Sequence, residues 1–66
     1  MLLGKKLKEL RNEKEISQEN LAKILKISRS ALALYETDKR QIPNELLPKF
    51  AEFFDVSIDY LFGLED

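Results

Sequence analysis

Three adjacent polar residues, Ser28, Arg29 and Ser30, stand at the start of a stretch with helical spacing. The planar fork of an arginine can pair with the O6 and N7 atoms of guanine, and a serine hydroxyl can bond to a base or a phosphate. Ser28 is interpreted first as a helix cap, and a capped helix end can also present its free amides to a phosphate. These side chains therefore suit hydrogen bonding to a nucleic acid.

Catalytic chemistry is not expected from this chain. Its 66 residues include neither histidine nor cysteine, which removes the commonest bases, nucleophiles and soft metal ligands. The two glycines cannot form a phosphate-cradling loop, and the carboxylates fall mainly on the outer faces of expected helices. We therefore predict a protein that is not an enzyme, with no metal, no cofactor and no evident small-molecule ligand.

Positive charge is concentrated in the first part of the chain. Residues 1–40 contain ten Lys and Arg against six Asp and Glu, a net charge of +4, whereas residues 41–66 contain one Lys against six acids, a net charge of −5. A basic region suits a nucleic-acid partner. An ordinary mixed surface with an acidic tail would contain the same charges, so charge alone leaves both interpretations open.

The composition predicts one ordered domain over residues 1–66. Hydrophobic residues make up 44% and charged residues 35%, as in folded proteins, and the length is near the lower limit for one core without staples. The N-terminal segment lacks the apolar run of a signal peptide, and no segment is long enough to span a bilayer. We expect a cytoplasmic protein.

Apolar residues at helical spacing predict three helices in the first half of the chain. The first covers residues 2–14, with Gly4 as a weak point in its first turn. A cap at Ser17 begins the second helix, which ends near Lys26. The third, capped by Ser28, covers residues 29–36.

The second half predicts two more helices and no strand. Asn44 is expected to cap the fourth helix, which begins later if Pro48 lies in its first turn. Ser57 is expected to cap a short fifth helix that stops at Gly63. Five short helices joined by short loops predict an all-α fold.

The second and third helices are joined by so few residues that they must cross closely. Ala22 is the small residue that the crossing needs. The apolar residues around it would bury one side of both helices: Leu21, Leu25, Ile27, Leu32 and Tyr35. The start of helix 29–36 then stays exposed. This is helix-turn-helix geometry, in which the second helix enters the DNA major groove.

Nearly the whole chain resembles the phage Cro and repressor type of helix-turn-helix proteins, also called the xenobiotic-response-element family. The matching segments are LKELRNEKEISQENLAKILKIS, SRSALALYETDKRQIP and KFAEFFDVSIDYLFG. The resemblance implies a five-helix, lambda-repressor-like domain, encoded by a bacterium or phage. It also implies a transcriptional regulator, most simply a repressor, that binds operator DNA, usually as a homodimer on a palindromic site.

The resemblance also assigns expected contacts to individual residues. Gln18 matches the position at the start of the second helix that touches the DNA backbone and often braces the recognition helix. Lys39 and Arg40 follow the recognition helix and would neutralise phosphates, unless their loop is only solvated. The complete set of expected DNA contacts is Gln18, Ser28, Arg29, Ser30, Ala33, Leu34, Lys39 and Arg40.

Four positions depart from the family pattern. Lys26 and Asp38 occupy sites that usually hold glycine, where we expect a left-handed backbone. Ala33 and Leu34 stand where polar or basic residues are common, on the face expected to meet DNA. They could contact thymine methyl groups or pack against a neighbouring helix or partner.

Arg11 and Glu36 are expected to have a structural role. In the family this pair ties the first helix to the end of the third, and a bidentate guanidinium–carboxylate contact would set the angle of the recognition helix.

The last two helices contain more apolar surface than one small core obviously needs: Phe50, Phe53, Phe54, Tyr60, Leu61, Phe62 and Leu64. Tyr60 and Phe62 are candidates for a two-fold contact that would place two recognition helices about 34 Å apart, one DNA turn. Alternatively, most of these side chains complete the core.

A second function remains open on the same fold. The apolar Ala33 and Leu34 could meet protein instead of DNA, as in an antitoxin-like or antirepressor partner.

Overall fold

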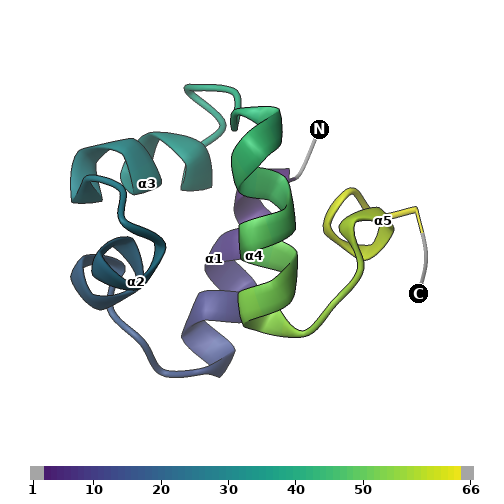
Figure 1. Cartoon of the computed structure of the whole chain (residues 1–66), viewed down its shortest axis with the longest axis horizontal. Coiled ribbons are helices and arrows are strands. Elements are labelled where there is room, and N and C mark those ends of the chain that lie inside the picture. Colours follow the sequence, from purple (N-terminus) through teal and green to yellow (C-terminus); the bar gives the residue numbers. More distant parts are fainter. Residues whose placement is uncertain (1–2, 65–66) are drawn as a thin grey trace.

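The computed structural model describes residues 3–64, and over that range its secondary structure consists of helices joined by short loops, with no strand, which confirms the predicted all-α fold (Figure 1). Its elements are α1 (Leu3–Glu13), α2 (Gln18–Leu25), α3 (Arg29–Glu36), the 3₁₀ turn η1 (Asn44–Leu46), α4 (Leu47–Phe54) and α5 (Ile58–Leu61). Helices α2 and α3 lie on one side of α1 and α4, and α5 lies on the other. No helix within residues 3–64 is long and apolar enough to cross a membrane.

Three serines begin helices as their positions predict. The hydroxyls of Ser17, Ser28 and Ser57 accept hydrogen bonds from the backbone N–H three residues later, at 3.0, 3.0 and 2.9 Å. Each such cap stabilises a helix start by about 0.5–2 kcal/mol. The caps set where α2, α3 and α5 begin, and the short turn between α2 and α3 follows from the second of them.

The predicted cap at Asn44 is wrong. This residue begins η1, and α4 starts at Leu47, preceded by Leu46, which makes no side-chain capping bond. Pro48 falls in the first turn of α4, where its missing N–H costs little. The later start of the fourth helix that Pro48 predicted is therefore confirmed. The predicted stop of the fifth helix at Gly63 is confirmed: α5 ends at Leu61, Phe62 is its C-cap, and Gly63 follows with a left-handed φ of 75°.

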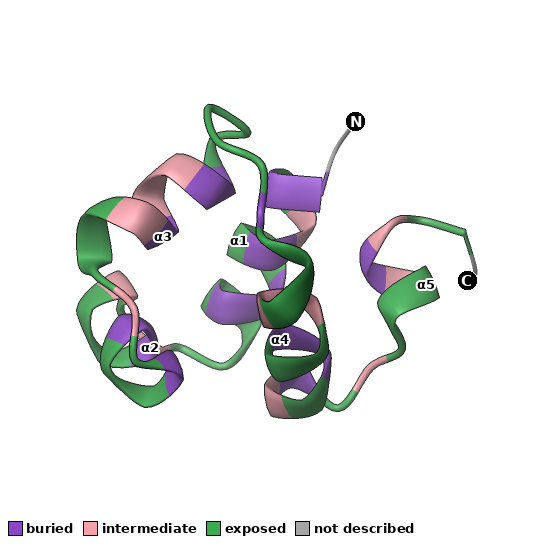
Figure 2. Ribbon diagram, turned by 45° about the horizontal axis from the view of Figure 1, so that its top comes forward, coloured by how far each residue is buried: buried purple, intermediate pink, exposed green. Residues whose placement is uncertain are grey.

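The core lies where α1, α2, α3, α4 and α5 face one another (Figure 2). Its least exposed large side chains are Leu7, Leu21, Leu32, Phe50 and Leu61. Ala22 is buried in α2, the helix that packs against α3, while Ile27 in the turn is only half-buried. One face of α3 is thereby held in the core and its first residues are left outside.

Candidate nucleic-acid interface

The first turn of α3 is open to solvent. Ser28, Arg29 and Ser30 are all exposed, whereas Ala33 and Leu34 on the same helix are half-buried. The Ser28 hydroxyl is used as a cap and accepts from the N–H of Ala31 at 3.0 Å. The donors of Arg29 and Ser30 are thus presented at a capped helix start whose other face is packed in the core.

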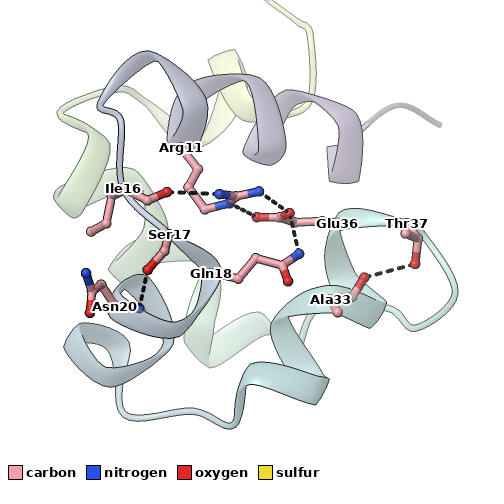
Figure 3. A network of polar contacts seen from close by, with 8 residues as sticks. All are labelled: Arg11, Ile16, Ser17, Gln18, Asn20, Ala33, Glu36 and Thr37. Carbon is pink, nitrogen blue, oxygen red and sulfur yellow. Dashed lines mark hydrogen bonds and ion pairs between the residues drawn. The ribbon is translucent and has the colours of Figure 1, made fainter.

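A polar network joins the C-terminal end of α3 to α1 and α2 (Figure 3). The Arg11 Nε and Nη2 atoms donate to the two carboxylate oxygens of Glu36 at 2.7 and 3.1 Å, so the pair is bidentate and links α1 to the last residue of α3. The third guanidinium contact, from Nη1, is to the backbone oxygen of Ile16 at 2.9 Å. Arg11 is 9% exposed and Glu36 4%. Because both charges are buried, removing either one would leave the other uncompensated in the protein interior, which is strongly destabilising.

Gln18 joins the same network from the first residue of α2. Its Nε2 donates to the Glu36 carboxylate at 3.0 Å, so the bracing partner of Gln18 is the carboxylate that also binds Arg11. A primary amide has a second N–H. The half-buried Gln18 therefore has a second amide hydrogen besides the one that it donates to Glu36. The family resemblance suggested the brace; that α1, α2 and α3 meet at one carboxylate emerges only from the structure.

Lys39 and Arg40 are exposed in the loop that follows α3. Their backbone N–H groups both donate to the carbonyl of Leu34, at 3.0 and 3.3 Å, and the Thr37 hydroxyl donates to the carbonyl of Ala33 at 2.9 Å. The backbone that carries the two cations is thus folded back on the end of α3.

The two positions where the family usually has glycine do adopt left-handed backbones. Lys26 has φ 60° and Asp38 φ 58°. The Lys26 N–H donates to the Ala22 and Lys23 carbonyls and ends α2. The helix-turn-helix is therefore intact without glycine in its turn, at the conformational cost that a residue with a Cβ incurs there.

Tyr60 and Phe62 are each half-buried and packed against the core. The Lys6 ammonium lies 4.6 Å from the centroid of the Tyr60 ring, a cation–π contact from α1. The more exposed apolar side chains near α5 are Ile58 and Leu64, which are 37% and 74% exposed. The apolar surface here thus lies partly on residues beside the two predicted ones.

One contact near the interface has no counterpart among the predicted site residues. The Gly4 N–H donates to Oδ1 of Asp38 at 3.0 Å, so the start of α1 is attached to the loop after α3. The signal available in the sequence was a glycine inside a helical pattern, which often marks a close packing contact.

Comparison with known proteins agrees with this geometry. The helix-turn-helix family model HTH_3 matches residues 7–61. The HTH-type transcriptional regulator ImmR of Bacillus subtilis (strain 168) is 38% identical over 66 residues, which are all of this chain and 52% of ImmR. The HTH-type transcriptional activator BcrR of Enterococcus faecalis is also 38% identical over 66 residues, 32% of its length.

A third relative, the uncharacterized HTH-type transcriptional regulator YobD of Bacillus subtilis (strain 168), is 34% identical over 61 residues, 92% of this chain and 54% of YobD. The chain thus spans about half the length of ImmR and YobD, and a third of BcrR. From the family match over residues 7–61 and these relatives, the chain belongs to the helix-turn-helix family, as a member of its Cro/repressor type.

Proposed function

We propose that residues 1–66 form a single DNA-binding domain of a transcriptional regulator, which places the start of α3 in the major groove of an operator. The observation that carries the proposal is the exposed, capped first turn of α3 beside a buried brace that fixes the far end of the helix. The relatives named as transcriptional regulators support it. These relatives come from bacteria, in which the chromosome lies in the cytoplasm. We therefore propose that this protein acts in the cytoplasm.

Each expected contact has a proposed role. Arg29 reads a guanine through its fork, and Ser30 bonds to a base or phosphate. Ser28 keeps its cap and offers the amide end of α3 to a phosphate. Ala33 and Leu34, which are half-buried, retain enough exposed apolar surface to meet a thymine methyl group.

Phosphate contacts would flank this base-reading turn. Gln18 donates its second amide hydrogen to a phosphate while its first stays on Glu36. Lys39 and Arg40, in the loop after α3, neutralise further phosphates. Such contacts orient the domain on the duplex, and their number sets the salt dependence of binding.

We further propose that the regulator binds as a homodimer and acts as a repressor. Tyr60 and Phe62, with the more exposed Ile58 and Leu64, supply an apolar surface for a two-fold contact. Two recognition helices one DNA turn apart, about 34 Å, would then read the halves of a palindrome. Repression follows if the operator overlaps a promoter. The relative named as an activator makes a promoter–reporter assay the deciding measurement.

Selection of bound sequences from a random DNA pool tests the proposal. Enrichment of a palindrome would support specific binding by a two-fold dimer, and enrichment of one half-site alone would support a monomer. A salt titration on the selected site separates the alternative function. Binding through several phosphates weakens steeply as salt rises, whereas apolar docking on a protein through Ala33 and Leu34 does not. A flat titration with no enriched sequence would favour the protein-interaction module.

A further inference from the structure

Asp38 lies where α3 ends and the loop that carries Lys39 and Arg40 begins. Its backbone N–H donates to the carbonyl of Tyr35 at 3.2 Å, and the Lys39 N–H donates to that of Leu34 at 3.0 Å. Two such bonds, closed by a left-handed residue, form a Schellman motif. The backbone of Asp38 therefore ends the recognition helix.

The Asp38 side chain acts on a different helix. Its Oδ1 atom accepts the N–H of Gly4 at 3.0 Å, across 34 positions in sequence. Gly4 lies in the first turn of α1, where backbone N–H groups have no intrahelical acceptor and the helix end favours a negative charge. Asp38 thus caps α1 with its carboxylate while it closes α3 with its backbone.

The two elements approach so closely that only glycine fits in α1. A Cβ atom at position 4 would lie 2.3 Å from the carbonyl oxygen of Tyr35 and 2.7 Å from that of Glu36. Helix α1 is therefore attached to the end of α3 at two points, first at Gly4 and then at Arg11, about two helical turns further along.

We propose that Asp38 is a positioning residue for DNA binding: its bond to Gly4 holds the loop in the orientation in which Lys39 and Arg40 meet phosphates. This inference rests on the proposed function. A carboxylate in a loop near phosphates would repel them, and the bond to α1 directs the charge of Asp38 toward the protein instead. A loop that is ordered before contact also loses less conformational entropy on binding.

The test compares Asp38→Asn with Asp38→Gly. Both substitutions remove the charge, and both residues tolerate the left-handed backbone. Only asparagine keeps an oxygen that can accept from Gly4. Hydrogen exchange at the Gly4 amide should stay slow in Asp38→Asn and become fast in Asp38→Gly, and circular dichroism should show both variants folded at the assay temperature.

The DNA readout is the slope of log affinity against log salt. We expect Asp38→Asn to keep the wild-type slope and Asp38→Gly to lose about 0.9 from it for each phosphate contact that the loop no longer makes. In a Lys39→Ala/Arg40→Ala background, the two variants should bind alike, because the cations through which Asp38 acts are gone. A purely structural cap would not give this dependence.

The outcomes are distinct. If Asp38→Gly binds with the affinity and slope of Asp38→Asn, or if it remains weaker when both cations are absent, the inference is overturned and the proposed function stands. If the wild-type protein binds DNA with no salt dependence, the proposed function is overturned and the inference with it. If Asp38→Gly does not fold, the Gly4 amide is compared in the wild type and Asp38→Asn alone. Equal exchange rates support the bond between residue 38 and Gly4, and faster exchange in Asp38→Asn overturns the inference.

Discussion

Arg11 of α1 and Glu36 of α3 form a bidentate ion pair that is almost completely buried, with distances of 2.7 and 3.1 Å between donor and acceptor atoms. Gln18 of α2 donates to the same carboxylate. Three helices, α1, α2 and the recognition helix α3, therefore meet at this carboxylate. Because rotation of α3 would stretch or break these bonds, the network fixes the direction in which Arg29 and Ser30 are presented.

Removing one partner of this pair should be severe. Arg11→Ala leaves the Glu36 carboxylate buried without its cation, which typically destabilises a protein by about 3–5 kcal/mol. A 66-residue domain has roughly 3–10 kcal/mol of stability in total. We expect a large fall in the urea midpoint. The double variant Arg11→Met/Glu36→Leu is the matched control and should be more stable than either single change; a double variant as unstable as Arg11→Ala would contradict this explanation.

Arg29 should determine preference at one base pair. Arg29→Ala should weaken binding to the preferred operator by about 1–3 kcal/mol and relax the choice at the guanine that it reads. Competition titrations against operators altered one base pair at a time would measure both effects. Ser30→Ala is a neighbouring control with a smaller expected loss. Equal weakening on every sequence would instead assign Arg29 to a phosphate.

Lys39 and Arg40 should contribute to the binding of every DNA sequence to a similar extent. Replacing either with alanine should weaken specific and non-specific sites alike and reduce the salt slope by about 1. The control is Lys8→Ala, an exposed cation on α1 that has no proposed DNA contact. An unchanged slope in both loop variants would mean that the loop points away from the duplex.

Gly4→Ala should destabilise the protein although alanine is the better helix former by about 0.8–1.0 kcal/mol. The new Cβ would meet the carbonyl oxygens of Tyr35 and Glu36, and overpacking of this kind costs about 1–3 kcal/mol. Thermal unfolding should show a lower midpoint, with each kcal/mol worth about 4–8 °C in a domain of this size. An unchanged or raised midpoint would show that α1 can move away from α3. Lys5→Ala, exposed on the same turn, should change the midpoint little.

Local signals in the sequence determined most of the fold. Serine caps at Ser17, Ser28 and Ser57 and apolar residues at helical spacing define helix starts and faces because both act within one or two turns of the chain. Asn44 does not cap α4, whereas Pro48, four residues later, correctly indicated the later start of that helix. The family motif then indicated the recognition helix and the pairing of Arg11 with Glu36.

Other features depend on segments far apart in the sequence, and only the tertiary structure decided them. The bond between Gly4 and Asp38 depends on how α1 packs against the end of α3. Gln18 and Arg11 donate to one carboxylate because α2 and α1 both pack against α3. The exposure of Ile58 beside the half-buried Tyr60 likewise depends on how α5 lies against α1 and α4. Sequence spacing records which residues share a helix face, whereas burial and contact between helices arise only when those faces are packed together.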